Sequence, residues 1–441
     1  MIFLALALLG LKAAGQHQLV IGTVLEKVKL QKADTLSYLL SLKKDSVYRF
    51  QVDQLGIAVS FKLLDASGQT LLKSRRPEDI TGWLSSEYSP LQDRTCVLKV
   101  CRYPDPENTP SGQFTLQVSA LSPMELVRRK QIKKELAAEN RKTVLTADID
   151  HFWQAFDALT VCRTKADSAA AFQRIYLDRA TDGLIDFMAA REITAERLQQ
   201  AVARYPRFYA SVRANTYGVK KSEALIKAIY KNFKALYGRF KPFKVCFAIG
   251  IANTGGTVSN EFVLIGTEVL ASSGKVDVSE FIRDQDISKA GLLSAGGDLK
   301  QKIRSMVAHE CVHTQQLSTG PGTCPLLSQV LREGICDFVG KLVAGGQINE
   351  KAHHYGDAHE KQLWEELRSG LCNGDPARWL YNGHTSKDRP ADLGYYMGYR
   401  IAKAYYDRAA DKRQAIAEMI LLNDAQQLLR DSGYEELMKE K

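Results

Sequence analysis

The stretch His309-Glu310-Cys311-Val312-His313 has the pattern HExxH. Residues four apart share one face of a helix, so the imidazoles of His309 and His313 can bind one zinc ion while Glu310 lies beside the water on that ion. The apolar residues before the motif recur at helical spacing: Leu299, Ile303, Met306 and Val307. The segment therefore predicts a helix that carries a zinc hydrolase site. Cys311 is not placed as a ligand and is interpreted as a small buried residue.

A peptidase zinc also needs a third protein ligand, and the expected one is Glu333. Residues 330–339 have the pattern of a second helix, which the turn residues before it would return to the first. Asp337 stands on the same helical face as Glu333, where it can accept the outer N–H of His309 and fix its tautomer. HExxH followed by ExxxD is the glutamate-zincin pattern. It predicts Zn2+ bound by the two motif histidines and this glutamate, with Glu310 as the general base.

A pair of predicted strands interrupts the helices of the second half. Residues 245–251 and 261–266 are apolar runs, and the Asn-Thr-Gly-Gly segment between them suits positive φ angles. The pattern predicts a hairpin with a long loop. In zinc peptidases an edge strand above the metal commonly binds an extended peptide by backbone hydrogen bonds. We therefore expect Gly255, Gly256 and Thr257 to bind the substrate, with a purely structural hairpin as the alternative.

Short alternating runs separated by turn residues fill the chain from Leu19 to about Leu121. The clearest are Tyr48–Val52, Ala58–Leu64, Cys96–Val100 and Phe114–Val118. This period-2 pattern predicts a β-sandwich. Cys96 and Cys101 would face opposite sides of one continuous strand, which argues against a disulfide between them.

The sandwich is expected to end at Ser122-Pro123-Met124-Glu125, where a capping serine, a proline at the first helical position and a glutamate form a capping box. From there the chain has mostly helical patterns. We therefore predict an α+β multidomain fold: an all-β, jelly-roll-like sandwich over residues 16–121, followed over residues 122–441 by a mainly α-helical, zincin-like domain with a small β-hairpin or sheet.

The N-terminus is interpreted as an export signal. Met1–Leu11 is apolar and the next residues are small, which predicts a signal peptide over residues 1–15. Beyond it no window is apolar enough for a transmembrane helix, so none is expected in the mature chain. The expected location is outside the cytoplasm of a bacterium, in the periplasm, on the cell surface or secreted. Export would let the eight cysteines pair, but the sequence does not give their connectivity.

The net charge of +10 is concentrated in two basic helical stretches, residues 128–142 and 220–244. Apolar residues recur within both at helical spacing, so solvated outer faces of amphipathic helices explain them. No nucleic-acid partner is expected. Association with an anionic envelope or cell surface stays open.

The other histidines compete weakly for a metal. His353, His354 and His359 lie close together, but Gly356 and Asp357 interrupt the segment, and His354 and His359 are poorly spaced for one helical face. We expect a solvated loop there. His384 lies in a polar turn without an evident metal partner, and His151 is expected to be a structural helix residue.

The residues from about 140 to 410 resemble the predicted zinc-dependent metallopeptidases known as domain of unknown function 2268, close to the gliding-motility lipoprotein B group. The matching elements are Phe172–Asp178, Gly183–Phe187, Ile249–Ser259, Leu264–Glu268, the two metal motifs and Gly394–Ile401. The resemblance implies a gluzincin-like catalytic domain and a peptide or protein substrate. Gluzincins often supply an oxyanion donor from a later helix, which suggests Tyr395, Tyr396 or Tyr399. Tyr395 matches the family's Gly-Tyr element, and helix packing is the alternative.

The N-terminal part resembles the bacterial pre-peptidase C-terminal type of jelly-roll domain. The matching residues are Asp45–Phe50, Leu63–Gln69 and Ser111–Val118. Such domains usually accompany secreted peptidases, which agrees with the signal peptide.

Three hypotheses follow from the sequence. The leading one is an exported zinc metallopeptidase in which Glu310 is the general base. The second is a catalytically silent envelope protein that keeps the zincin fold for assembly or binding. The third gives the function to the sandwich as a carbohydrate or protein binder. The intact Glu310 favours the first, because a scaffold that needed only zinc could lose it.

Overall fold

The computed structural model describes residues 16–74, 80–104, 108–284, 286, 289, 293, 296–316, 324–383 and 389–440. The predicted signal peptide and His384 lie outside these residues. The chain forms two compact units, Met1–Lys134 and Glu135–Lys441. It passes from one to the other within helix α1 (Pro123–Asn140), which begins at the predicted end of the sandwich.

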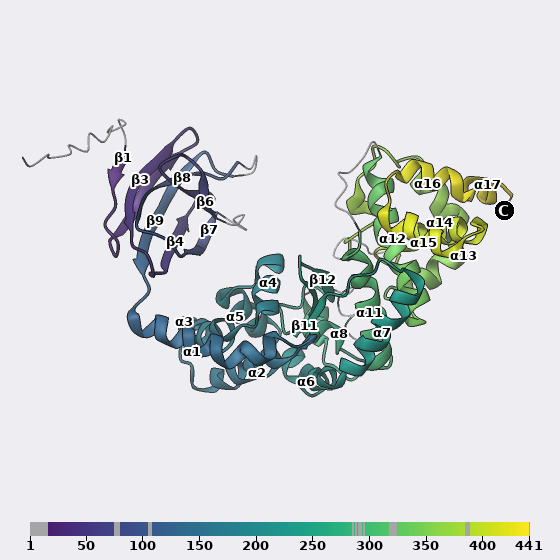
Figure 1. Ribbon diagram of the computed structural model, residues 1–441, viewed down its shortest axis with the longest axis horizontal. Helices are drawn as coiled ribbons and strands as arrows, with labels where there is room; N and C mark the ends of the chain where they lie inside the picture. Colours follow the sequence, from purple (N-terminus) through teal and green to yellow (C-terminus); the bar gives the residue numbers. More distant parts are fainter. Residues whose placement is uncertain are drawn as a thin grey trace, which may run out of the picture. The chain divides into compact units, whose positions relative to one another are not determined.

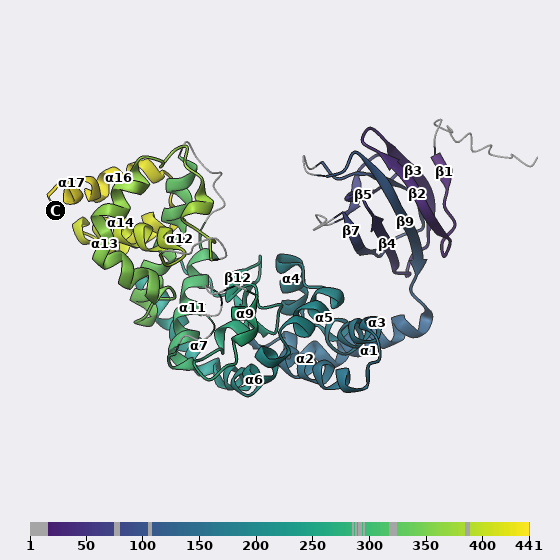
Figure 2. The ribbon, with the colours of Figure 1, turned by 180° about the vertical axis from the view of Figure 1, so that it is seen from behind.

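The N-terminal unit is a β-sandwich, seen in Figure 1 and from behind in Figure 2. Its strands are β1 (Gln16–Gln18), β2 (Val24–Gln31), β3 (Thr35–Leu42), β4 (Tyr48–Leu55), β5 (Val59–Leu64), β6 (Thr70–Lys73), β7 (Thr81–Tyr88), β8 (Arg94–Arg102) and β9 (Ser111–Ala120). One sheet has the order β1-β3-β8-β5-β6 and the other β2-β9-β4-β7. Alternate residues such as Phe50, Phe61 and Phe114 point into one apolar core. The predicted fold class, an all-β part followed by a mainly helical part, is confirmed.

Helix α1 begins with half of the predicted capping box. The Ser122 hydroxyl accepts the Glu125 N–H at 3.1 Å, as expected for an N-cap. The Glu125 carboxylate, however, accepts from the Arg49 guanidinium at 3.0 Å. A charged partner on strand β4 has therefore taken the glutamate that the local pattern assigned to the cap.

The C-terminal unit is helical around one small sheet. Its first part comprises β10 (Val144–Leu145), α2 (Ala147–Ala158), η1 (Leu159–Val161), α3 (Lys165–Ala171), η2 (Phe172–Tyr176), η3 (Leu177–Arg179), α4 (Asp182–Arg191), α5 (Ala195–Arg204), α6 (Pro206–Thr216), η4 (Tyr217–Lys221), α7 (Glu223–Leu236), β11 (Lys244–Ala248), β12 (Gly256–Val258), β13 (Phe262–Gly266), α8 (Thr267–Leu270) and α9 (Ser279–Arg283). Its second part comprises α11 (Leu299–His313), α12 (Pro325–Ala344), α13 (Glu350–Arg368), η5 (Pro376–Arg378), α14 (Leu393–Arg408), α15 (Lys412–Leu421), α16 (Ala425–Ser432) and α17 (Tyr434–Glu440).

The sheet of this unit corrects the predicted hairpin. Its order is β10-β11-β13-β12, and β11 pairs with β13 in parallel. The turn-rich segment between them contains β12, which takes the antiparallel place beside β13 at the open edge. Strands β11 and β13 are almost wholly buried, as is typical of the interior of a parallel sheet with both faces covered. Their continuous apolar runs were therefore a sign of parallel pairing.

Helix α12 is held against two neighbours by glycines. A Cβ atom at Gly334 would collide with the backbone of Gly398 and Tyr399 in α14. At Gly340 a Cβ would lie 3.2 Å from the backbone nitrogen of His309 in α11. The absence of these side chains lets the three helices approach closely, and it fixes where their functional side chains meet.

One pair of cysteines is bonded in the helical unit. Cys324 and Cys372 form a disulfide that ties the start of α12 to the segment after α13. Cys96 and Cys101 are free, as expected for two residues on opposite faces of one strand.

Within the described residues, no helix combines the length and apolar character needed to cross a membrane.

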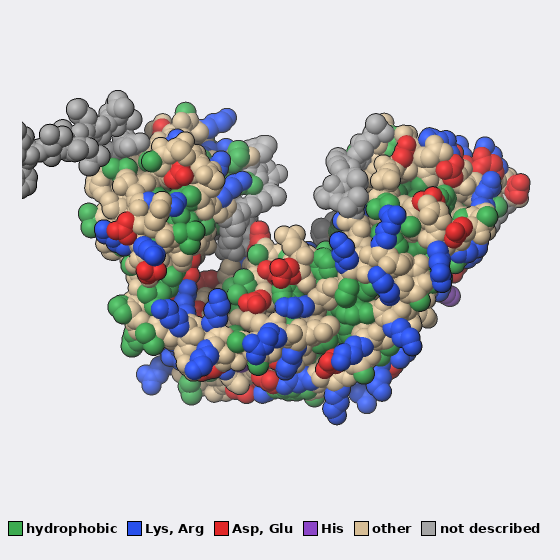
Figure 3. Space-filling model, viewed as in Figure 1, with side chains coloured by type: hydrophobic (Ala, Val, Ile, Leu, Met, Phe, Trp, Pro, Cys, Tyr) green, Lys and Arg blue, Asp and Glu red, His purple; other side chains and the backbone are tan. Residues whose placement is uncertain are grey.

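The positive charge of the helical unit is spread out. Figure 3 shows Lys and Arg side chains scattered over the visible face among acidic and apolar ones. In the basic stretches, Lys220 pairs with Asp150 at 2.6 Å and Lys227 with Glu223 at 2.8 Å. Part of the charge of these stretches is therefore balanced locally.

Replacing Gly334 by Ala tests the helix crossing. In an open helix this change would stabilise the protein by about 1 kcal/mol, because glycine is a poor helix former. Here we expect a loss of about 1–3 kcal/mol, because the methyl group would push two backbones apart. The measurement is the free energy of unfolding in denaturant. The control is Gly238→Ala, where a Cβ meets no atom within 4 Å and stability should hardly change. A Gly334→Ala protein as stable as wild type would contradict the close crossing.

Candidate metal centre

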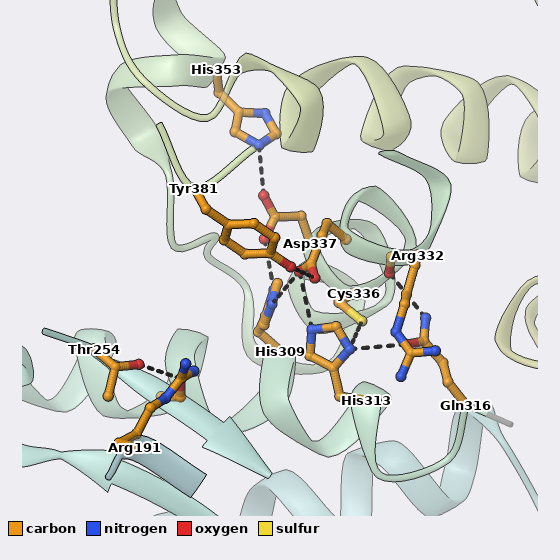
Figure 4. A network of polar contacts seen from close by, with 12 residues as sticks. Arg191, Thr254, His309, His313, Gln316, Arg332, Cys336, Asp337, His353 and Tyr381 are labelled. Carbon is orange, nitrogen blue, oxygen red and sulfur yellow. Dashed lines mark hydrogen bonds and ion pairs between the residues drawn. The ribbon is translucent and has the colours of Figure 1, made fainter. Parts of the chain in front are cut away.

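Two histidines and a glutamate converge between helices α11 and α12. His309 and His313 lie one turn apart on α11 (Figure 4), and Glu333 lies on α12. The Nε2 atom of His313 lies 3.1 Å from Glu333 Oε2, and that of His309 lies 3.6 Å from the same oxygen. The structure thus brings the three predicted ligands together at one point.

The outer ring nitrogens of both histidines have acceptors. His309 Nδ1 lies 2.8 Å from Asp337 Oδ1, as the sequence predicted. His313 Nδ1 lies 2.9 Å from Gln316 Oε1, and Gln316 in turn donates to the carbonyl of Arg332 at 3.0 Å. Carboxylate and amide oxygens only accept, so each Nδ1 carries the proton and each Nε2 is available as a metal ligand. Sequence reasoning missed Gln316, although its place one turn after His313 was a usable signal.

The charges at this point suit a divalent cation. Glu310, Glu333 and Asp337 are all buried, and the last two pair with imidazoles. Burial raises the pKa of Glu333, but His313 and His309 outweigh it and hold that pKa well below its usual range. Burial lowers the pKa of His309, but hydrogen bonds to Asp337 and Glu333 outweigh it and raise that pKa to about 10. Without a metal ion, the protonated imidazole of His309 therefore balances the negative charge of Glu333. A metal ion bound to Nε2 would take the place of that proton and supply the positive charge instead.

Cys336 is the competing third ligand. It offers a sulfur that, with one nitrogen of each motif histidine, forms a group within 4.8 Å. However, this sulfur lies 3.4 Å from His313 Nδ1, the nitrogen that Gln316 already occupies. Burial also raises the pKa of the thiol well above its usual value, which disfavours the thiolate that binds metals. Glu333 faces both Nε2 atoms and is the better ligand for zinc.

Glu310 faces the edge strand β12. A Cβ at Gly256 would lie 2.5 Å from Glu310 Oε1, so any side chain there would push the carboxyl away from the strand. Burial raises the pKa of Glu310, while the charges of His313 and His309 act in the opposite direction. A carboxylate whose pKa is raised is a stronger base than one in water.

The three residues predicted to bind substrate differ in where their backbone points. The Gly255 carbonyl accepts the Gly266 N–H at 3.1 Å, so it faces β13. Hydrogen bonds alternate along an antiparallel pair, so Thr257, opposite Leu264, also faces β13. Gly256 lies between them and directs its backbone N–H and C=O away from β13, towards the open edge. Of the three, Gly256 is therefore the one whose backbone faces the open edge, where its carbonyl accepts from Thr254 and Arg191.

Two tyrosines flank the centre. The ring of Tyr395, on α14, stacks on that of His309 with centroids 6.0 Å apart. The hydroxyl of Tyr381 donates to Glu333 Oε1 at 2.5 Å. Burial raises the pKa of both hydroxyls, as does the charge of Glu333, so both remain donors at neutral pH. Sequence reasoning chose Tyr395 and missed Tyr381. The loop before α14 brings Tyr381 in from outside the metal motifs, so no spacing rule indicates it.

The prediction of a solvated loop around His353 is wrong. His353 lies on helix α13, which continues past Gly356 with a kink at His359. The helix tolerates Gly356 because the ring of Tyr396 packs against that position. His353 is buried, and its Nε2 lies 3.2 Å from Asp337 Oδ2. Asp337 therefore joins His309 to a second histidine, one that local spacing alone had assigned to solvent.

The match to a known family covers this centre. Residues 292–429 match the family described as "Predicted Zn-dependent protease (DUF2268)". The matched segment contains HExxH, the ExxxD motif and the helices α12 to α15. The predicted resemblance to this family is confirmed over these residues. No curated protein matches the chain.

Two solved structures are similar to part of the chain. One is the pre-peptidase C-terminal domain of a collagenase from Bacillus anthracis, at 17% identity, with 24% of this chain and 94% of that chain covered and a TM-score of 0.20. The other is the periplasmic lysozyme inhibitor PliG from Aeromonas hydrophila, at 13% identity, with 24% and 96% covered and a TM-score of 0.20.

Substitutions at the centre will distinguish the possible ligands. We expect His309→Ala and Glu333→Gln to lose most bound zinc, because each removes one of three protein ligands. Cys336→Ser should keep it. Asp337→Asn should weaken zinc affinity about 10- to 100-fold by releasing His309. The measurement is elemental analysis of each protein after dialysis against buffered zinc, with circular dichroism as the control for folding. Zinc retained by Glu333→Gln but lost by Cys336→Ser would assign the third ligand to the thiol.

Proposed function

We propose that this chain is an exported zinc metallopeptidase of the gluzincin type. The observation that carries the proposal is the convergence of two Nε2 atoms and the Glu333 carboxylate beside a buried Glu310 that faces an edge strand. The C-terminal unit thus contains a set of zinc ligands, a carboxylate that can act as the base, and an edge strand that can bind an extended peptide. The family match adds a predicted zinc-dependent protease over residues 292–429, which include the three ligands and Glu310 but not the edge strand.

The residues of the centre have separate roles in this proposal. His309, His313 and Glu333 hold the zinc ion, which when bound activates water and polarises a carbonyl. Glu310 takes a proton from the attacking water and gives it to the leaving amine. Asp337 and Gln316 keep the two imidazoles in the tautomer that presents Nε2.

The substrate in this proposal is a peptide or protein that extends along β12. Gly256 and Val258 direct their backbone groups to the open edge, by the same alternation that turns Thr257 towards β13. A peptide laid on this edge would pass beside Glu310. Backbone pairing of this kind gives affinity with little sequence preference.

Export forms part of the proposal and has one structural support. The disulfide between Cys324 and Cys372 is of a kind that persists in oxidising compartments. The sandwich would then be an accessory domain of an exported enzyme, as its resemblance implies.

The variant Glu310→Gln tests the activity. We expect peptide cleavage to fall by about 10²–10⁴-fold, because the amide cannot accept the water proton. Zinc content should stay stoichiometric, because Glu310 is not a ligand. The measurement is a peptide-library digest followed by mass spectrometry, with elemental analysis of the same samples. Glu350→Gln, an exposed glutamate of the same unit, is the control and should cleave normally.

The same experiment separates the enzyme from a silent scaffold. Stoichiometric zinc without any Glu310-dependent cleavage would contradict the peptidase and favour the scaffold. A folded, unchelated protein without zinc would contradict both.

Tyr381→Phe tests whether Tyr381, rather than the predicted Tyr395, donates a hydrogen bond to the developing oxyanion. The Tyr381 side chain is 63% exposed although its hydroxyl reaches Glu333, so a bound substrate can contact it. We expect kcat to fall by about 10²–10³-fold with zinc retained, as when one donor to a developing oxyanion is lost. Tyr395→Phe is the matched comparison. Its ring packs on His309, so we expect a smaller fall in kcat. If steady-state kinetics show a larger fall in kcat for Tyr395→Phe than for Tyr381→Phe, Tyr395 is the oxyanion donor.

A further inference from the structure

Arg191 stands at the end of the open edge of the sheet. It is the last residue of α4, and its Nη2 donates to the Gly256 carbonyl at 3.3 Å (Figure 4). Its Nε is buried and has no hydrogen-bond partner among the described residues. A buried guanidinium N–H without an acceptor is uncommon in folded proteins and points to a missing partner.

The Gly256 carbonyl is already satisfied on the side where a substrate would bind. Thr254 donates its hydroxyl to this carbonyl at 2.7 Å, in addition to Arg191. The backbone N–H of a substrate strand would otherwise donate there. The guanidinium therefore occupies the position that the next residues of a bound peptide would need. The edge of β12 that can pair with a peptide ends at Arg191.

Which end of a peptide meets the guanidinium depends on the direction in which the peptide pairs with β12, and the proposal takes the antiparallel direction. A peptide antiparallel to β12 runs from Val258 towards Gly256, because β12 itself runs from Gly256 to Val258. Its C-terminal side then reaches Arg191, which contacts the same Gly256 that Glu310 faces. Planar guanidinium groups bind carboxylates through paired N–H donors, and one such donor of Arg191 is unused.

The local charges also favour an anionic ligand at this residue. The carboxylates of Glu333 and Asp337 form ion pairs with histidines. Glu192, next to Arg191 in the chain, pairs with Arg197. Glu310 lies close enough for the charge of Arg191 to oppose the rise of its pKa, but among the described residues it forms no ion pair with Arg191. The positive charge of Arg191 is therefore available to a ligand that enters along β12.

We propose that Arg191 binds a carboxylate of the substrate on the C-terminal side of the cleaved bond, which makes it a specificity-determining residue. This rests on the proposed peptidase function. The carboxylate can come from the C-terminus of the peptide or from an acidic side chain. The blocked carbonyl of Gly256 favours the C-terminus, because a chain that ends there needs no further backbone pairing.

The test uses the full-length, zinc-loaded protein and matched peptide libraries. One library has free C-terminal acids and the other has C-terminal amides, with identical sequences. A second pair has Glu and Asp replaced by Gln and Asn in the same sequences. For wild type we expect kcat/KM to be about 10- to 100-fold higher for acids than for amides, as is typical of a hydrogen-bonded charge pair. Arg191→Gln should remove this preference and Arg191→Lys should keep part of it.

A binding measurement separates this proposal from the peptidase itself. Calorimetry with the zinc-loaded Glu310→Gln protein should show the same preference for acids over amides without any cleavage. The matched control is Arg204→Gln, which removes an exposed arginine that pairs with Asp284 elsewhere in the unit. It should leave the preference unchanged.

The outcomes are distinct. A preference for free acids assigns the C-terminal carboxylate, and a preference confined to Glu and Asp peptides assigns a side chain. Equal binding and cleavage of all matched pairs by wild type would overturn the proposal and leave Arg191 as a tether of β12, with the peptidase intact. If the wild-type protein cleaves no peptide but the zinc-loaded Glu310→Gln protein still binds acids better than amides, the peptidase is contradicted and the carboxylate site is not. The wild-type comparison decides the matter even if Arg191→Gln does not fold.

Discussion

The charge balance between Glu333 and two imidazoles, inside the contact of α11 with α12, is the interaction on which the rest of the C-terminal unit depends. Buried carboxylates are costly unless they are paired or bind a cation, so the helices around them cannot shift without exposing or separating charges. The glycines at positions 334 and 340 let α12 come close enough for this pairing. The sheet then needs only to bring one edge strand to Glu310.

The centre extends further from the metal ligands than the two motifs suggest. Asp337 binds His309 with one oxygen and His353 with the other, and the rings of Tyr396 and Tyr399 pack edge-on against His353. Helices α13 and α14 therefore hold the orientation of His309 from a distance. A ligand whose outer nitrogen is fixed in this way loses little conformational freedom when it binds a metal.

The sequence predicted what depends on spacing within one helix. His309, Glu310 and His313 share a turn of α11, and Glu333 and Asp337 share a face of α12, so period alone placed them. Tyr381 and His353 reach the centre from other elements, which no local pattern indicates. The parallel pairing of β11 with β13 was missed for a different reason. Turn residues between two strands suggest a hairpin, and this signal was given more weight than the continuous apolar runs, which are typical of parallel strands buried on both faces.

Strand β12 has only three residues, and one of its outward carbonyls is covered by Arg191. Open sheet edges are sites where copies of a protein can join into larger assemblies, and natural folds protect them by keeping edge strands short or by placing charges on them. The edge beside Glu310 has both protections. Because β12 is so short, it can pair with only a brief stretch of a bound peptide, and it offers equally few backbone groups to a second copy of the chain.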